Sequence, residues 1–362
     1  MLDDFITFGR SGLRVSRYAL GAFNFGGSQS WSLDAAAAGR MIAHYRELGG
    51  NFLDCANSYG GGEAEVIIGD YLAAEPGARD RLVIASKFGS NTQPGDPNSG
   101  GAGRKAIIQT CERSLRRLRT DRLDLYWMHL WDPYTPMEET LRALDDLVSA
   151  GKILHVGLSN TPAWKISEAH WIAQWRNHMP IAGLQLQYSL MERSIEIEHV
   201  PMAQAYGMNI AAWSPLRNGA LSGRYRKGDP EGHNAEGRAV FVTRALDDRS
   251  DAILDTLIAV AERNGVSPSQ AALAWLRVQP AMGTILLGAH TIDQLTENAA
   301  SARIELPAED LAALDEVSKP RIPYPGDFAR RAIGSISGGT RINGVFSQPG
   351  AGSPSQGGGG KA

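Results

Sequence analysis

The sequence predicts an α/β protein, a closed (β/α)8 (TIM) barrel with an N-terminal β-hairpin plug and a C-terminal extension. Short apolar runs alternate with helical patterns along most of the 362 residues. The apolar runs are continuous, which is typical of parallel strands covered on both faces. Eight strands, each followed by a helix, is the number that closes such a barrel. An open doubly wound sheet is the alternative, but it normally carries a nucleotide-binding loop after its first strand, and the sequence has none there.

The expected strands are the short apolar runs Ala19–Gly21, Asn51–Cys55, Leu82–Ser86, Leu123–Met128, Ile153–Leu158, Gly183–Gln187, Asn209–Trp213 and Thr284–Leu287. The expected helices have apolar residues at helical spacing: Asp34–Leu48, Glu63–Ala73, Lys105–Leu118, Met137–Ala150, Ala163–Gln174, His199–Tyr206, Arg249–Asn264 and Ile292–Ala302. The first of these has an Asp N-cap and ends at a Gly-Gly pair. Ahead of the first strand, Phe5–Phe8 and Leu13–Val15 flank a polar turn, and we expect this hairpin to plug the N-terminal mouth.

Composition excludes several classes of protein. The chain has 36 basic and 39 acidic side chains, a formal charge of −3, so no basic excess marks a nucleic-acid binder. Its two cysteines, Cys55 and Cys111, rule out a disulfide scaffold and a cysteine-based zinc site. No apolar run is long enough for a membrane span, and the N-terminus lacks the apolar stretch of a secretory signal. These features predict a cytoplasmic protein without a membrane or nucleic-acid partner.

Composition also predicts the domain boundary. We expect one barrel domain over residues 1–334, followed by a flexible tail rich in Gly, Ser and Pro over residues 335–362. Two long insertions, Thr92–Ala102 and Arg217–Phe241, fall where specificity loops are found. The glycines at 101–103 and 60–62 resemble nucleotide loops only weakly, because the first set does not follow a strand and the second lacks a following Lys.

Four polar residues stand at or just after the ends of three successive predicted strands. Asp54 ends the second strand and Tyr59 follows in its loop, Lys87 ends the third strand, and His129 ends the fourth. Barrel active sites are built at the carboxyl ends of the strands. Each residue alone has an ordinary structural explanation, but a lysine that ends an apolar strand needs a partner, which Asp54 supplies. The conjunction predicts a catalytic site.

The chain resembles the aldo-keto reductase family, in its aryl-alcohol-dehydrogenase-like branch. The resemblance runs from the N-terminal hairpin to about residue 320, in the segments FLDCANSYGGGEAEVIIGDYL, LVIASKFG, SLRRLRTDRLDLYWMHLWD, GKILHVGLSN, GLQLQYSLMER and ILLGAHTIDQLTENAAS. It implies a barrel that binds a nicotinamide cofactor without a Rossmann fold. The implied reaction is the reversible reduction of a small aldehyde or ketone to an alcohol.

The resemblance also implies roles for the four polar residues. Hydride that arrives at a carbonyl carbon leaves negative charge on the oxygen, which a donor must neutralise. Tyr59 is the implied general acid, and Lys87 beside it stabilises the phenolate and is held by Asp54. His129 is implied to donate a hydrogen bond to the carbonyl oxygen.

Further residues correspond to the cofactor site of the family. The expected cofactor-binding set is Ala22, Asp54, Ser159, Asn160, Gln185, Trp213, Ser214, Leu216, Gly219, Arg224, Gly288, His290, Gln294, Glu297 and Asn298. Within it, Ser159, Asn160 and Gln185 resemble the carboxamide ligands, and Trp213 resembles the aromatic that stacks on the nicotinamide. The helix N-terminus near Thr291 adds donors for phosphate. Four loop aromatics are expected to form an apolar substrate cup: Phe23, Trp31, Phe88 and Trp131.

The expected cofactor is NADP(H), with NAD(H) as the second option. Family members that prefer NADP usually carry Lys or Arg after the eighth strand, whereas this chain has His290 there. A histidine is at most partly charged at neutral pH. No carboxylate replaces the missing cation, so nothing repels a 2′-phosphate, and the expected preference for NADP(H) is narrow.

Two other functions stay open at this point. A lysine at a strand end in a barrel is also typical of Schiff-base lyases, although a carboxylate partner keeps Lys87 protonated and non-nucleophilic. Some members of the family are cofactor-bound regulatory subunits with little turnover. The sequence does not specify the physiological substrate, the favoured direction or the oligomeric state.

Overall fold

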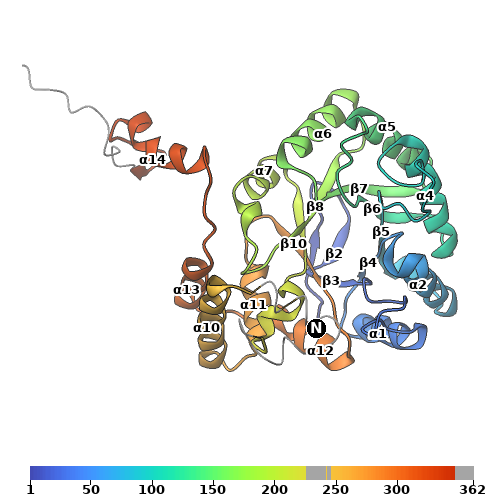
Figure 1. Cartoon of the computed structure of the whole chain (residues 1–362), viewed down its shortest axis with the longest axis horizontal. Helices are drawn as coiled ribbons and strands as arrows, with labels where there is room; N and C mark the ends of the chain where they lie inside the picture. The colour runs from blue at the N-terminus through green and yellow to red at the C-terminus, as the bar shows by residue number, and fades with distance from the viewer. Residues whose placement is uncertain (226–241, 243–245, 347–362) are drawn as a thin grey trace, which may run out of the picture. The chain divides into compact units, whose positions relative to one another are not determined.

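The computed structural model, which describes residues 1–225, 242 and 246–346, contains a closed barrel of eight parallel strands (Figure 1). Around the barrel the order is β10-β3-β4-β5-β6-β7-β8-β9. Each predicted strand overlaps an observed one, so the predicted fold is confirmed. The strands are β3 (Tyr18–Gly21), β4 (Phe52–Asp54), β5 (Val83–Phe88), β6 (Leu123–Met128), β7 (Ile153–Ser159), β8 (Ile181–Gln187), β9 (Asn209–Trp213) and β10 (Met282–Leu287).

Helices surround the strands, and every predicted helix is present. They are α1 (Ala35–Glu47), α2 (Glu63–Ala74), α4 (Arg104–Arg117), α5 (Met137–Ser149), α6 (Ala163–Arg176), α7 (His199–Tyr206), α10 (Asp248–Arg263) and α12 (Ile292–Ala300). The sequence interpretation missed α3 (Ala78–Arg81), α11 (Pro268–Arg277) and α13 (Ala308–Ser318). Helix α11 is buried along most of its length, and its apolar residues 271–276 form one continuous run. Its Ser267 N-cap and Pro268 were the available signal.

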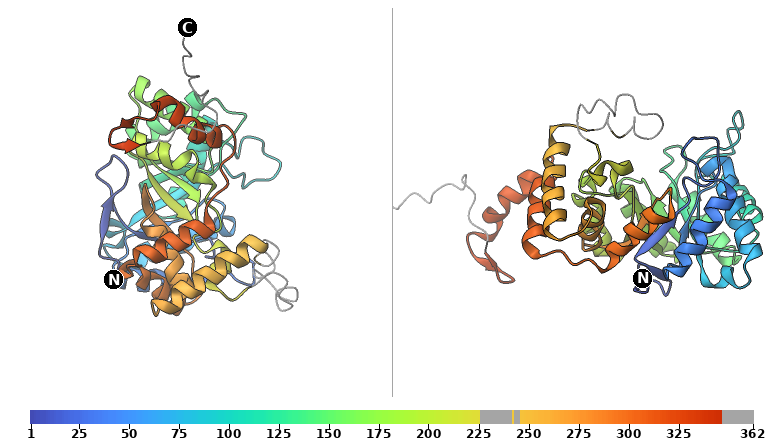
Figure 2. Two further views of the ribbon diagram at one scale, coloured as in Figure 1. Left: turned by 90° about the vertical axis from the view of Figure 1, so that its left-hand side faces the viewer. Right: turned by 90° about the horizontal axis from the view of Figure 1, so that it is seen from below.

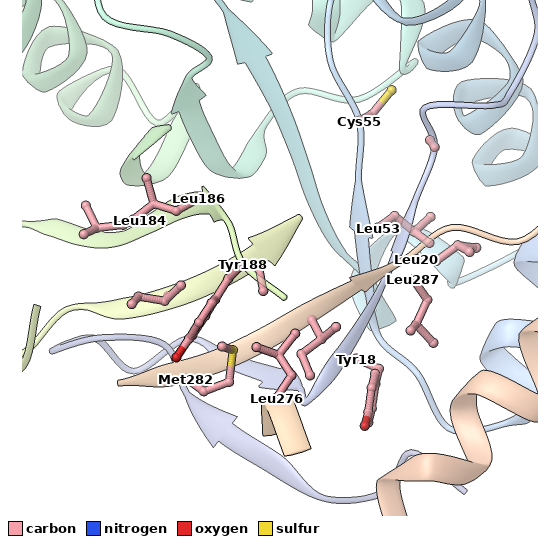
Figure 3. Close-up of a cluster of buried hydrophobic side chains, with 14 of the residues drawn as sticks. Tyr18, Leu20, Leu53, Cys55, Leu184, Leu186, Tyr188, Leu276, Met282 and Leu287 are labelled. Carbon is pink, nitrogen blue, oxygen red and sulfur yellow. The ribbon is translucent and has the colours of Figure 1, made fainter. Parts of the chain in front are cut away.

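Side chains that point outward from the barrel form the main core against the helices. Figure 3 shows part of this layer, with Tyr18 and Leu20 from β3, Leu184 from β8 and Met282 from β10 near Leu276 of α11. These side chains are almost fully buried. The apolar layer fixes the strands and so fixes the polar residues at their carboxyl ends.

The N-terminal mouth of the barrel is closed by an antiparallel hairpin of β1 (Phe5–Thr7) and β2 (Arg14–Ser16), which Figure 2 shows at one end of the barrel. Phe8, just after β1, is fully buried. Its ring packs edge to face on Phe52 and Trp127, with centroids 6.4 and 6.0 Å away. It belongs to an apolar cluster of inward-facing strand residues. The predicted hairpin plug is therefore confirmed.

The chain divides into two compact units at a different place from the predicted boundary. The first unit is Met1–Lys319 and the second is Pro320–Ala362, so the barrel unit ends at Lys319 and not at residue 334. The second unit includes α14 (Gly326–Ser337) and a hairpin of β11 (Arg341–Ile342) and β12 (Val345–Phe346). Three prolines follow the last barrel helix and open the second unit. The predicted boundary was placed where the Gly-rich composition begins, and that composition begins only after the second unit has started.

Some predicted segments extend beyond the described residues. Within the predicted tail, 347–362 lie outside them, and within the predicted insertion Arg217–Phe241 only Arg217–Tyr225 is described. None of the helices in the described part of the chain could span a membrane. The same part contains no group of three or more metal-ligating side chains.

Candidate active site

A large cavity of about 1350 Å³ opens at the carboxyl ends of the strands. Its lining comes from the loops that follow β3, β4, β9 and β10 and from residues at the ends of β6, β7 and β8. Asp54, Tyr59 and His129 all contribute to this lining. Three of the four predicted catalytic residues thus share one cavity, and the fourth, Lys87, lies directly behind Tyr59.

Lys87 is fully buried and makes three polar contacts. Its Nζ forms an ion pair with the Asp54 carboxylate, donates to the backbone carbonyl of Cys55 at 2.8 Å and donates to the Tyr59 hydroxyl at 3.1 Å. The other carboxylate oxygen of Asp54 accepts from Gln185 Nε2 at 2.8 Å. These contacts satisfy a charge that would otherwise be strongly destabilised by burial.

The electrostatics keep Lys87 charged and Tyr59 protonated. Burial by itself lowers the pKa of Lys87, but Asp54 and Tyr59 more than offset it, and the net pKa is raised. Burial also raises the pKa of the Tyr59 phenol, and the opposing effect of Lys87 does not fully cancel it. The sequence interpretation considered only the stabilisation of the phenolate by Lys87. The structure adds that desolvation is the larger effect, so Tyr59 carries its proton at neutral pH.

His129 faces Tyr59 across the cavity. The two rings meet edge to face with centroids 5.9 Å apart. Burial and the nearby Lys87 charge lower the pKa of His129 from 6.5 to about 3. Its Nδ1 lies 3.5 Å from the Ser90 hydroxyl. His129 is therefore a neutral imidazole at physiological pH, and one ring nitrogen carries a proton that it can donate.

Local backbone features bring Tyr59 to Lys87. Because side chains alternate along a strand, Lys87 points into the barrel while its neighbours Ser86 and Phe88 point to the helices. Tyr59 begins a 3-10 turn in which Gly60 has φ 56°. A Cβ on Gly60 would lie 3.0 Å from the Phe25 carbonyl oxygen, so this close approach of two loops favours glycine.

The other side of the cavity is built around Asn160 and Trp213. Asn160 has φ 48°, and its side-chain amide donates to the His129 carbonyl at 2.8 Å. Its carbonyl oxygen accepts from the indole nitrogen of Trp213 at 3.1 Å. This fixes the half-buried Trp213 ring at the wall of the cavity, which Gln185 also lines. The pair lines the same cavity as Tyr59 and His129.

Most of the predicted cofactor residues line this cavity. Besides Asp54, they are Asn160, Gln185, Trp213, Ser214, Leu216, Gly219, Arg224, Gly288, His290, Gln294, Glu297 and Asn298. Ala22 and Ser159 do not line it, because both are buried within the barrel wall. The Ser159 hydroxyl instead accepts from Asn160 Nδ2 at 2.9 Å and so helps to orient Asn160.

Two of the four aromatic residues predicted to form the substrate cup line the cavity, and two do not. Phe23 and Trp31 line the cavity, stacked at 5.4 Å, and Phe23 contacts the Tyr59 ring edge to face. Phe88 is fully buried in the core against Tyr126, because it alternates with the inward Lys87. Trp131 packs on the core and on Trp164 and does not line the cavity.

Sequence reasoning missed several lining residues, among them Asn24, Gln29, Ser267 and Ser269, whereas Asn218 and Tyr225 belong to the predicted specificity loop Arg217–Phe241. Asn24 donates to the Ala289 carbonyl at 2.7 Å and thereby joins the loop after β3 to the loop after β10. Ser267 and Ser269 come from the start of the unpredicted helix α11. The Ser-Pro sequence at its N-terminus was the signal that could have placed them.

Comparison with known proteins identifies the family. Residues 17–319 match the sequence model of the aldo/keto reductase family. The chain belongs to this family. The match spans the barrel unit almost completely, and it confirms the resemblance of the sequence to this family.

This aldo/keto reductase has curated relatives that cover most of both chains. It is 32% identical over 332 residues to the uncharacterized oxidoreductase YrpG of Bacillus subtilis, covering 89% of this chain and 97% of that protein. It is 30% identical to the putative aryl-alcohol dehydrogenase AAD14 of Saccharomyces cerevisiae, over 90% of this chain and 88% of the relative. It is 34% identical to a putative voltage-gated potassium channel subunit beta of Schizosaccharomyces pombe, over 85% and 91%. The chain is thus an NAD(P)H-dependent oxidoreductase of the aldo/keto reductase family.

Proposed function

We propose that this aldo/keto reductase interconverts small aldehydes or ketones and the corresponding alcohols with NADP(H), using Tyr59 as the general acid and base. The observation that carries the proposal is the 3.1 Å contact between the Tyr59 hydroxyl and the buried Lys87 ammonium, at the wall of the cavity. A phenol beside a fixed cation can release and recover its proton.

The cavity has the size and chemistry for a dinucleotide. Its volume of about 1350 Å³ exceeds the roughly 300–1000 Å³ of common ligand pockets. Asn160, Gln185 and Trp213 would hold the nicotinamide, and the residues from Gly288 to Asn298 would hold the adenosine end. Bound there, the nicotinamide cofactor supplies hydride to a carbonyl or accepts it from an alcohol.

The residues of this chain handle the proton. In reduction, Tyr59 donates its hydroxyl proton to the carbonyl oxygen as negative charge develops on it, and the resulting phenolate is stabilised by the Lys87 ammonium. Asp54 keeps Lys87 charged and in place. His129, as a neutral imidazole, donates a hydrogen bond that orients the oxygen. In oxidation, the Tyr59 phenolate takes the proton from the alcohol.

The raised pKa of Lys87 speaks against a Schiff-base lyase. A lysine nucleophile must be neutral, and the Asp54 carboxylate holds this one in its charged form. A second candidate function does have support. The 34% identity to a putative potassium channel subunit beta favours a cofactor-bound regulatory subunit with little turnover.

A screen of aldehydes, ketones and alcohols with both cofactors separates these functions. The proposal expects turnover with at least one substrate and a higher kcat/KM with NADPH than with NADH. Tight cofactor binding with only slow turnover across the whole panel would contradict it and favour the regulatory subunit. Covalent trapping of a carbonyl compound on Lys87 by borohydride, without nicotinamide, would favour the lyase.

A further inference from the structure

An ion pair between a buried carboxylate and a partly buried guanidinium lies behind the Tyr59 loop, outside the cavity. Glu65, near the start of α2, is fully buried, and its carboxylate binds Arg117 at the end of α4 at 3.0 Å. The second oxygen of Glu65 accepts from the Ser86 hydroxyl at 2.5 Å. Neither charged residue lines the cavity. Neither residue of the pair takes part in the proposed reaction. A buried charge destabilises the fold unless it is well bonded, so the pair calls for an explanation.

The two partners of this ion pair reach both sides of the Tyr59–Lys87 contact. Glu65 binds Ser86, the residue before Lys87 on β5. Arg117 donates to the backbone carbonyl of Asn57, two residues before Tyr59, at 3.3 Å. The pair therefore ties the strand that carries the ammonium to the loop that carries the phenol.

Gly62 shows how closely Arg117 supports this loop. A Cβ on Gly62 would lie 2.5 Å from Cζ and Nη1 of Arg117, so the guanidinium packs against the glycine backbone. Gly62 has φ 102°, a conformation that also favours glycine. The 3-10 turn that begins at Tyr59 thus rests on the Arg117 guanidinium at its end.

The same network continues toward His129. Asn57 is buried, and its side-chain amide donates to the Ser90 carbonyl at 3.1 Å. The Ser90 hydroxyl lies 3.5 Å from Nδ1 of His129. The loop that Arg117 holds is thereby connected to the segment that orients the imidazole.

From this arrangement we infer that Glu65 and Arg117 are positioning residues, which set the distance between the Tyr59 hydroxyl and Lys87 without touching substrate or cofactor. The inference rests on the proposed role of Tyr59. A misplacement of a reacting group by about 1 Å lowers a rate by roughly 100-fold. Loss of the pair should therefore lower kcat and leave ligand binding nearly intact.

A second largely buried ion pair, which also bonds to β5, provides a matched control. Arg79 binds Asp124 at 2.9 Å, and Asp124 accepts from the backbone of Ile84 at 2.7 Å. Arg79 also donates to the Arg122 carbonyl at 2.9 Å, just as Arg117 donates to the Asn57 carbonyl. This pair lies at the amino-terminal ends of β5 and β6, away from the cavity.

The test compares Arg117→Met, Arg117→Lys, Glu65→Gln and the control Arg79→Met. For each variant we would measure kcat and KM with a reactive carbonyl, the Kd of NADPH by fluorescence, and Tm. Arg117→Met and Arg79→Met should both lower Tm. Of these two variants, only Arg117→Met should lower kcat, by about 10- to 100-fold. Its KM and its Kd for NADPH should stay within about twofold of the wild-type values. Arg117→Lys should recover most of the kcat, and Glu65→Gln should lower it about tenfold.

Two results would overturn the inference. The first is that Arg117→Met has the same kcat as Arg79→Met. If Arg117→Met does not fold, Glu65→Gln takes its place in this comparison. The other is a loss of kcat that is matched by an equal loss of NADPH affinity, which would indicate general damage to the cavity. A Tyr59→Phe variant, measured alongside, distinguishes a failure of the proposed function from a failure of the positioning role. If it keeps wild-type kcat, the proposed function fails; if it is inactive while Arg117→Met is unaffected, only the positioning role fails.

Discussion

The two ends of the barrel differ in the side chains that point inward, which are apolar at the amino-terminal end and charged at the carboxyl end. At the amino-terminal end, β4, β5 and β6 turn Phe52, Val83 and Leu125 inward around Phe8 of the plug. At the carboxyl end, two of these strands supply Asp54 and Lys87, an ion pair with almost no exposed surface. Apolar packing commonly stabilises a protein at least as well as a buried ion pair does. The charged end is thus poorly explained by stability and is better explained by chemistry.

This difference separates the effects of mutation. Substitutions at the plug should change the free energy of unfolding and leave kinetics alone. Substitutions at the carboxyl end should change kinetics first, with an effect on stability only where a buried charge loses its partner.

The largest effect is expected from Lys87→Met. It removes the cation that stabilises the Tyr59 phenolate and leaves the Asp54 carboxylate buried without its charged partner. Activity should be abolished, and unfolding should become easier by about 3–5 kcal/mol. Asp54→Asn should be milder, because Lys87 would still contact the phenol. Steady-state kinetics and denaturant unfolding measure both effects, and a greater loss of activity in Asp54→Asn than in Lys87→Met would contradict the assigned order.

Phe8→Ala should give the opposite pattern. The ring is fully buried against Phe52 and Trp127, so its removal should destabilise the fold by about 3–5 kcal/mol. The kcat of the folded enzyme should stay near the wild-type value. Phe5→Ala is the control, because Phe5 belongs to the same hairpin but is exposed. If Phe8→Ala lowered kcat at temperatures where the protein stays folded, the two ends would not be independent.

A smaller effect is expected from His290→Arg. His290 lines the cavity, its Nδ1 is 3.1 Å from the Trp31 carbonyl, and its backbone nitrogen donates to Gln294. A permanent cation there should strengthen the preference for NADP(H) by about 1–3 kcal/mol, the usual contribution of a hydrogen bond to a charged group. The ratio of kcat/KM for NADPH and NADH measures it. His170→Arg, on α6 outside the cavity, adds the same charge and should leave the ratio unchanged. An unmoved ratio in His290→Arg would place the 2′-phosphate elsewhere.

The smallest expected kinetic effect is on the pH profile. The pKa of His129 is lowered to about 3, so the imidazole does not titrate between pH 5 and 8, and kcat/KM should show no limb near 6.5 from this residue. The unfolded chain takes up this proton below about 6.5. The stability due to neutral His129 is therefore present above pH 6.5 and is lost as pH falls toward 3. Comparing wild type with His129→Gln, in kinetics and in unfolding across this window, tests both statements. A limb near 6.5 that disappears in His129→Gln would contradict them.

Sequence patterns predicted the barrel well because each strand is a short, doubly covered apolar run with a helix after it. Asp54, Lys87 and His129 could be placed because polar residues at the ends of such runs point to one mouth. The errors have physical causes. Phe88 was assigned to the cavity although strand alternation, given an inward Lys87, directs it to the helices. Helix α11 was missed because its apolar residues 271–276 form one continuous run, a pattern that does not distinguish a buried helix from a strand.

Other features depend on distances that sequence does not encode. The direction of the Tyr59 pKa follows from a balance between burial and the Lys87 charge, and only the structure weighs the two. The link between Arg117 and the Asn57 carbonyl joins residues far apart in the chain. Local patterns give no sign of such a contact.

The proton of Tyr59 is central to the proposed reaction. The decisive measurement is the single-turnover rate of cofactor oxidation in Tyr59→Phe, preloaded with NADPH and mixed with a carbonyl substrate that the wild type reduces. The substitution keeps the ring packing against Phe23 and removes only the hydroxyl. We expect an unchanged Kd for NADPH and a rate lower by at least the roughly 10²–10⁴-fold typical of general acid catalysis. A rate equal to that of the wild type would show that Tyr59 is not the acid.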